Sequence, residues 1–142
     1  MKKYNLLVPL AGRGQRMIDG GYSMPKPLIF AGDRRIIDYS LDSIDRSECN
    51  LIFVVRRDHI CNFSIDKTLV SKYGEDIKIV VTDEDTRGSV ESCYLAKEYI
   101  DDDLPLIICT SDIYFEPVFT PTDDMFENDG LQLLIENLNK PT

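Results

Sequence analysis

The chain has 142 residues, 43% of them hydrophobic, and a formal net charge of −9 from 16 basic and 25 acidic side chains. This length suits one globular domain with one core, so we predict a single domain over residues 1–142. The acidic balance argues against nucleic acid and an anionic membrane as electrostatic partners. Residues 1–42 carry a net charge of +3 and residues 101–142 a net charge of −9, so an anionic ligand is expected near the first third.

The ends and apolar runs of the sequence predict a cytoplasmic protein. The opening MKKYNLLVPLAG has only a short apolar run, broken by Pro9, which is not typical of a signal peptide. No run approaches the roughly 18 apolar residues of a membrane span. The four cysteines form no CxxC pair and predict reduced thiols. His59 is the only histidine, and in the charged stretch RRDHI we expect it to be a solvated loop residue.

Five short apolar runs predict the strands of a sheet. They cover Tyr4–Leu10, Leu51–Val55, Ile77–Thr82, Leu106–Thr110 and Leu131–Ile135. Because the runs are continuously apolar rather than alternating, they are typical of strands covered on both faces. The sequence therefore predicts an α/β fold, a three-layer α/β/α sandwich around a mainly parallel sheet.

Three connecting segments predict helices. The segment 34–47 repeats apolar side chains at helical spacing, with Asp33 as a cap ahead of it. The segment 57–76 predicts one short and one longer helical piece. The segment 88–103 predicts a helix with one face formed by Ser89, Cys93, Ala96 and Ile100.

The strand ends carry the unusual residues. A doubly wound sheet binds ligands beyond the carboxyl ends of its strands, which here lead into AGRGQRM, DEDTRGS and SDIYF. Gly12 and Gly14 would let backbone N–H groups approach a ligand. Met17 stands where a dinucleotide fingerprint needs glycine, so GxG alone leaves open a simple strand end turned by glycines.

Three cations accompany the glycines. Arg13 and Arg16 add charge that cannot be neutralised. Lys26 lies between Pro25 and Pro27, which restrict the backbone on both sides of it. This stiffness indicates a lysine aimed at a ligand, although a proline-flanked surface lysine without a role remains the alternative.

Together these motifs carry a resemblance to a known family. LVPLAGRGQRM followed by PKPLI resembles the opening signature of the sugar-1-phosphate nucleotidylyltransferases, the nucleotide-sugar pyrophosphorylases. The likeness continues through TRGSVESCYLAKEYI and PLIICTSDIYF. It implies a GT-A-like, Rossmann-related fold and an enzyme that joins a nucleoside triphosphate to a sugar 1-phosphate or related phosphomonoester, releasing pyrophosphate. Cell-surface polysaccharide precursor synthesis is the pathway it suggests.

The resemblance also implies roles for individual residues. Arg16 would grip the leaving pyrophosphate, Lys26 would contact the α-phosphate and the acceptor phosphate, and Asp112 would hold Mg²⁺. Base, ribose and phosphates would be cradled through the backbone of Leu10, Ala11, Gly12 and Gly14. Asp83 is our choice for reading the base edge, with Gly88 allowing the base to approach the backbone; Glu84 and Asp85 fit a solvated turn equally well. An exposed strand-end carboxylate is the alternative for Asp112.

The sequence departs from the family in length. Family members continue with a portion that supplies a second metal-binding aspartate and the sugar-phosphate groups, so we expect a chain that lacks this portion. A sheet ending here would expose an edge and apolar surface, which predicts a homo-oligomer. Two other functions remain open: a non-catalytic nucleotide-binding module, and a GT-A glycosyltransferase that would use Asp112 for its metal.

Overall fold

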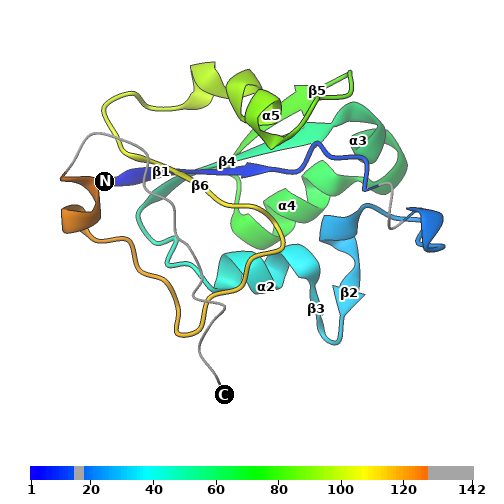
Figure 1. Ribbon diagram of the computed structural model, residues 1–142, viewed down its shortest axis with the longest axis horizontal. Helices are drawn as coiled ribbons and strands as arrows, with labels where there is room; N and C mark the ends of the chain where they lie inside the picture. The colour runs from blue at the N-terminus through cyan, green and yellow to red at the C-terminus, as the bar shows by residue number, and fades with distance from the viewer. Residues whose placement is uncertain (15–17, 128–142) are drawn as a thin grey trace.

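The computed structural model of this protein describes residues 1–14 and 18–127 (Figure 1). The predicted strand Leu131–Ile135 and the predicted site residue Arg16 lie outside the described residues. In the part that is described, one four-stranded sheet forms the centre of the molecule. A small two-stranded hairpin lies beside it.

The four predicted strands in the described part are present. They are β1 (Tyr4–Pro9), β4 (Cys49–Arg56), β5 (Lys78–Thr82) and β6 (Leu106–Ile108). The sheet order is β5-β4-β1-β6, and all three pairings are parallel. β1 is therefore internal, with β4 on one side and β6 on the other, and the direction of winding reverses at β1.

Helices cover both faces of the sheet, which confirms the predicted three layers. On one face, α2 (Ile36–Asp42) and α4 (Ile65–Tyr73) bury Ile37, Leu41 and Leu69 against the sheet. On the other, α5 (Ser89–Leu95) and η2 (Lys97–Tyr99) adjoin a second core that contains Leu7 and Ala96. Figure 1 shows α5 on one side of the sheet and α2 and α4 on the other. Continuous apolarity of the strands thus follows from burial on both faces.

The link between β4 and β5 consists of two helices, as predicted. The shorter is α3 (Arg57–Phe63) and the longer is α4. Ser64 separates them with a left-handed backbone, φ 51°. The longest helix in the described ranges, α4, has nine residues, and none of these helices could cross a lipid bilayer.

The start of the predicted helix 34–47 is wrong. Residues Arg34–Arg35 form strand β3, paired with β2 (Phe30–Ala31), and α2 begins only at Ile36. Gly32, at φ +77°, supplies the positive φ that a tight two-residue hairpin turn requires. Asp33 therefore lies in the turn, where it accepts a hydrogen bond from the Tyr39 hydroxyl, instead of capping the helix.

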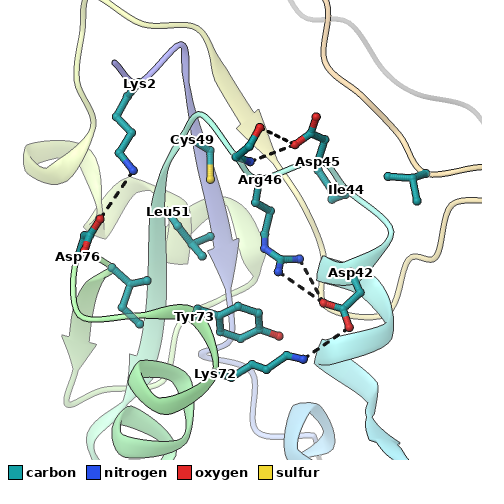
Figure 2. Close-up of a pocket in the computed structure, with 13 residues that line it drawn as sticks. Lys2, Asp42, Ile44, Asp45, Arg46, Cys49, Leu51, Lys72, Tyr73 and Asp76 are labelled. Atoms are coloured by element: carbon teal, nitrogen blue, oxygen red, sulfur yellow. Dashed lines mark hydrogen bonds and ion pairs between the residues drawn. The ribbon is translucent and has the colours of Figure 1, made fainter.

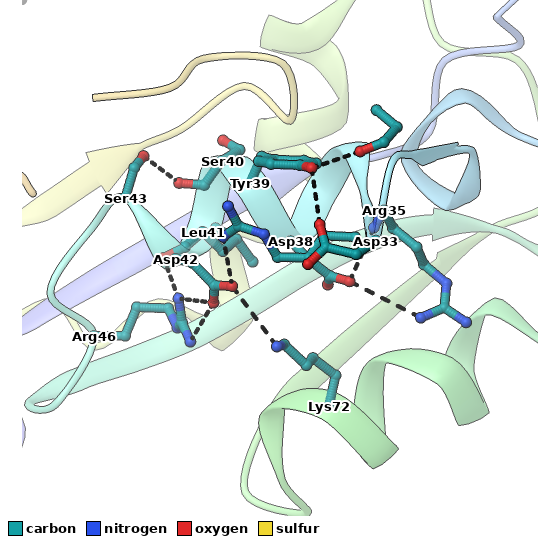
Figure 3. A network of polar contacts seen from close by, with 12 residues as sticks. Asp33, Arg35, Asp38, Tyr39, Ser40, Leu41, Asp42, Ser43, Arg46 and Lys72 are labelled. Atoms are coloured by element: carbon teal, nitrogen blue, oxygen red, sulfur yellow. Dashed lines mark hydrogen bonds and ion pairs between the residues drawn. The ribbon is translucent and has the colours of Figure 1, made fainter. Parts of the chain in front are cut away.

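Asp38, in the first turn of α2, takes over the capping role predicted for Asp33 (Figure 3). Its carboxylate accepts a hydrogen bond from the Arg35 backbone N–H at 3.3 Å and another from the Tyr73 hydroxyl at 2.7 Å. Tyr73 ends α4, so this buried carboxylate also ties α2 to α4. Burial and the Asp38 carboxylate raise the pKa of Tyr73 well above its ordinary value.

The predicted face of α5 is nearly right. Ala96 is buried, and Cys93 and Ile100 pack partly against the sheet. Ser89 is exposed, however, and Ser92 is the buried serine. Its hydroxyl meets Thr86 Oγ1 at 2.7 Å and so draws the preceding loop toward the helix.

The expectation of a solvated loop position for His59 is wrong. His59 lies in α3, only 8% exposed, and its ring packs edge-on against Phe63 of the same helix. Within the described ranges its Nδ1 has no hydrogen-bond partner. α3 begins directly after β4, so its first turn carries His59 inward even though charged residues flank it.

Asn5 organises the interior of the sheet, a role that the sequence patterns did not reveal. It is fully buried in β1. Its Nδ2 donates to the Asp101 carbonyl at 2.9 Å, and its Oδ1 accepts from the Asp101 N–H at 3.1 Å and from Asn50 Nδ2 at 2.8 Å. One side chain thereby joins β1, β4 and the turn that leads into β6.

We predict that Asn5→Ala lowers the free energy of unfolding by about 2–4 kcal/mol, because it leaves several buried polar groups without partners. Urea unfolding followed by circular dichroism measures the change. Asn62→Ala, at an exposed position on α3, is the control and should change stability by less than about 0.5 kcal/mol. Equal losses in both variants would contradict the role given to Asn5.

His59 makes stability depend on pH. Burial lowers its pKa, opposed by Asp58 and assisted by Arg56. Between the lowered pKa and the ordinary value of about 6.5, the unfolded chain binds a proton that the folded chain does not. We therefore predict that the free energy of unfolding falls as the pH drops from about 7.5 through 6.5, and that His59→Leu flattens this dependence. Denaturant titrations at each pH measure it, and an unchanged slope in the variant would contradict it.

The β6 edge carries the prediction of self-association. In the described part of the chain β6 pairs only with β1, and Leu106 and Ile108 are 42% and 51% exposed. The double change Leu106→Lys/Ile108→Lys should weaken self-association by at least about tenfold, since burying such side chains is worth roughly 1.5–3 kcal/mol each. Val118→Lys, also at an exposed apolar position, is the control. Sedimentation velocity measures this, and a wild-type monomer at high concentration would overturn it.

Candidate functional site

The sheet order defines where a ligand can bind. β1 lies between β4 and β6, so the segments that follow β1 and β6 leave the sheet from neighbouring strand ends. In open α/β sheets the crevice beyond such a reversal point is the usual ligand site. The predicted glycine loop follows β1 and the predicted metal ligand Asp112 follows β6, so the topology brings both to this edge of the sheet.

The glycine loop leaves the core at the end of β1. Leu10 and Ala11 are each 3% exposed, and the Leu10 N–H donates to the Val54 carbonyl at 2.7 Å. Gly12 and Gly14 lie beyond this anchor. Gly14 has φ +64°, a conformation that side-chain-bearing residues rarely adopt, and a Cβ there would lie 4.0 Å from the Lys26 Cβ. The loop therefore runs beside Lys26.

The flanking prolines restrict the turn that carries Lys26. Lys26 begins the short 3-10 helix η1 (Lys26–Leu28), in which Pro27 and Leu28 are buried. Pro25, just ahead of it, has φ −56° and ψ 140°. Lys26 thus projects from a turn that is fixed to the core.

Lys26 and Asp112 meet beyond the carboxyl ends of β1 and β6. Lys26 Nζ donates to Asp112 Oδ2 at 2.8 Å, although the two residues are 86 positions apart. Their side chains are 38% and 50% exposed, so the pair faces solvent. The hydrogen bond from Lys26, more than any other group, holds the pKa of Asp112 below its ordinary value. The carboxylate is consequently ionised at neutral pH.

Two of the three acidic residues in the loop between β5 and α5 have different partners. Asp83 pairs with Arg57 at the surface. Asp85 pairs with both Arg13 and Arg56, and these guanidinium groups, Arg56 foremost, lower the pKa of Asp85. Asp85 is therefore an exposed turn residue, as remained possible from sequence, and it is held by two guanidinium groups.

Gly88 sits at the N-cap of α5, where the β5–α5 loop ends. Its φ of +156° and ψ of −177° lie in a region that is almost exclusive to glycine. The predicted glycine is thus required by the backbone itself, whatever ligand approaches it.

A well-defined cavity in the described structure lies elsewhere. It measures about 540 Å³ and is lined by residues at the amino ends of the strands, among them Lys2, Arg46 and Cys49 (Figure 2). Its cations are paired: Arg46 and Lys72 with Asp42, and Lys2 with Asp76. None of the predicted site residues lines it, and it lies at the opposite edge from the crevice.

Comparison with known families identifies the chain. The model of the nucleotidyl transferase family matches residues 7–137. The chain belongs to the nucleotidyl transferase family. This match covers the glycine loop, Lys26 and Asp112, and it agrees with the resemblance found in the sequence. No curated protein matches the chain.

Several solved structures have a similar fold. A nucleoside-diphosphate-sugar pyrophosphorylase from Vibrio cholerae RC9 aligns with a TM-score of 0.67 at 20% identity, over 88% of this chain and 54% of that one. An inositol-1-phosphate CTP transferase from T. maritima gives 0.66 at 16% identity, over 82% and 46%. A UDP-glucose pyrophosphorylase from Acinetobacter gives 0.58 at 20% identity, over 80% and 47%. The chain thus spans about half the length of these proteins.

Asp112 offers the kind of donor that Mg²⁺ prefers. Mg²⁺ is commonly bound by one or two carboxylates together with substrate phosphates and water. The ionised, half-exposed Asp112 is a donor of this kind. No group of three or more His, Cys, Asp or Glu suited to a metal occurs in the described ranges.

Sequence reasoning did not single out Arg56. It is the last residue of β4, between the ends of β1 and β5, and only 11% of its side chain is exposed. Its position directly after the predicted strand Leu51–Val55 was the available signal. Its partner Asp85, 29 residues away, could not be chosen from the acidic run DEDTRGS without the fold.

We predict that Lys26→Met raises the pKa of Asp112 toward its ordinary value, because the main group that favours the carboxylate is lost. A ¹³C NMR titration of the Asp112 carboxyl measures it, with the midpoint moving to higher pH. Lys67→Met, at an exposed position on α4, is the control and should leave that midpoint unchanged. An unmoved midpoint in Lys26→Met would contradict the ion pair.

Proposed function

We propose that this protein transfers a nucleotidyl group from a nucleoside triphosphate to a sugar 1-phosphate or related phosphomonoester, releasing pyrophosphate, with Mg²⁺ as cofactor. The observation that carries the proposal is the 2.8 Å pair between Lys26 and Asp112, beside the glycine loop and at the reversal point of the sheet. Family membership supports the reaction type. The pyrophosphorylase names of similar structures support the acceptor class.

The proposed reaction is an in-line displacement at the α-phosphorus. An oxygen of the acceptor phosphate forms a bond to this phosphorus while the bond to the β-phosphate breaks, and pyrophosphate leaves with its electron pair. The acceptor is already ionised, so no general base is required. Repulsion between the two anions is the main obstacle, and cations fixed in advance lower it.

Each site residue has a proposed part in this step. Lys26 neutralises charge on the α-phosphate and the incoming phosphate, and its proline-fixed turn limits reorganisation. Arg16 stabilises the leaving pyrophosphate. Gly12 and Gly14, with the backbone of Leu10 and Ala11, receive the nucleotide. Asp112 would hold Mg²⁺, which when bound supplies further positive charge at the phosphates.

Base recognition is proposed for Asp83 and Gly88. Gly88 offers backbone without a side chain at the start of α5. The Asp83 carboxylate accepts a hydrogen bond from Arg57, so a base would have to share or replace that partner. Which base is read decides which nucleoside triphosphate is used, and calorimetric titration with all four in Mg²⁺ would answer it.

A non-catalytic nucleotide-binding module is the second candidate. It is favoured because the described residues contain no group of three or more His, Cys, Asp or Glu suited to a metal. This function predicts Mg²⁺-dependent nucleotide binding without pyrophosphate release.

The decisive test is pyrophosphate release from each nucleoside triphosphate with phosphorylated acceptors. Lys26→Ala and Arg16→Ala should each lower turnover by about 10²- to 10³-fold, by analogy with the loss of one preorganised donor to a developing negative charge. Lys67→Ala is the matched control and should keep wild-type turnover. Binding without turnover in the wild-type protein would favour the module, and absence of both would overturn the proposal.

A further inference from the structure

A chain of ion pairs crosses the carboxyl edge of the sheet next to the proposed nucleotide site. The Asp85 carboxylate accepts a hydrogen bond from Arg13, Nε to Oδ1 at 2.8 Å, and its Oδ2 forms an ion pair with Arg13 Nη2 at 2.5 Å. It also accepts one from Arg56 Nη1. Arg56 is held from its other side by Asp58, at 2.9 Å through both Nε and Nη2.

The chain joins three segments that are distant in sequence. Arg13 belongs to the glycine loop after β1, Arg56 ends β4, and Asp85 lies in the loop after β5. β4 lies between β1 and β5 in the sheet, and Arg56 pairs in register with Thr82, the last residue of β5. Asp85 consequently bridges the loops on either side of β4, with the end of β4 as the support between them.

The two arginines differ in burial, which indicates different roles. The Arg56 side chain is 11% exposed and has two carboxylate partners, so it forms a rigid support. The Arg13 side chain is 60% exposed, and it belongs to the glycine loop, whose position the ion pair with Asp85 fixes. Single exposed ion pairs contribute little, but two-point arginine–carboxylate contacts within a network contribute more. The neighbouring ion pair of Arg57 and Asp83 is a single exposed contact, with side chains 58% and 66% exposed.

We propose that Asp85 is a positioning residue that, through Arg13 and Arg56, fixes the spacing between the glycine loop and the β5–α5 loop and thereby sets affinity for the nucleoside triphosphate. This inference rests on the proposed function, in which these two loops receive the phosphates and the base. Asp85 does not touch the reacting atoms, because both of its oxygens are already occupied by guanidinium groups. Its loss should therefore raise KM and spare kcat.

The first test is steady-state kinetics of Asp85→Asn, which removes the charge and keeps the size. KM for the nucleoside triphosphate should rise about three- to tenfold with kcat within about twofold, the range expected for losing one partly desolvated charged pair. In an Arg13→Met background, Asp85→Asn should add little, since both changes break the same bridge. A fall in KM would mean that Arg13, once freed, binds phosphate itself, and would overturn the proposal.

The matched control is Glu48→Gln. Glu48 pairs with Lys3 at 2.9 Å and so links the starts of β1 and β4, at the opposite edge of the same two strands. This variant should leave KM and kcat unchanged. An equal rise in KM in Glu48→Gln would assign the effect to general loss of ion pairs and contradict a positioning role for Asp85.

A second measurement is independent of any activity. Hydrogen exchange of the amides in residues 11–14 and 86–88 should be faster in Asp85→Asn than in the wild-type protein, and unchanged in Glu48→Gln. Should Asp85→Asn fail to fold, Arg13→Met breaks the same bridge from its exposed side and should give the same change. Unaltered exchange would overturn the inference even if the enzyme is active. Faster exchange in a protein that neither binds nor turns over nucleotide would instead reject only the proposed function.

Discussion

Burial of β1 on both faces is the constraint on which the rest of this molecule depends. Its apolar side chains alternate between two cores, with Leu6 and Val8 on one face and Leu7 on the other. The buried Asn5 side chain hydrogen-bonds the Asp101 carbonyl and the Asn50 amide. It thereby joins β1 to β4 and to the turn before β6. The chain passes from β1 to β4 and β5 on one side and then returns to place β6 on the other side of β1, so the winding reverses at β1 and its carboxyl end is the expected ligand position.

The carboxyl edge of the sheet is charged but internally balanced. Lys26 faces Asp112, Arg57 faces Asp83, and Asp85 lies between two arginines. An anionic ligand at this edge must therefore compete with carboxylates for the cations. The half-exposed pair of Lys26 and Asp112 exchanges partners at low cost, because water solvates both groups while they part. The partly buried Arg56 is costlier to release, since its two carboxylates replace water that it has already lost.

This difference separates the site into a responsive part and a supporting part. In the proposed reaction the Lys26 turn meets the phosphates, while the bridge through Asp85 keeps the surrounding loops in register. Such preorganisation favours phosphoryl transfer, because positioning and electrostatic stabilisation supply most of the catalysis of this reaction. The rigid 3-10 turn at Lys26 and the glycine-only backbone of Gly88 serve the same end.

The sequence by itself determined the local elements and the motifs. Continuous apolar runs predicted the four described strands because burial on both faces leaves no alternation, and AGRGQRM with PKPLI indicated the family that the matching model then confirmed. Tertiary structure decided which distant groups meet. The Lys26–Asp112 pair, the bridging by Asp85, the burial of His59 and the network around Asn5 all depend on strand order and on which way a helix turns after its strand. Periodicity reports only whether a face is buried. It does not encode the neighbour that a strand takes across the sheet, because that choice follows from how the whole chain packs.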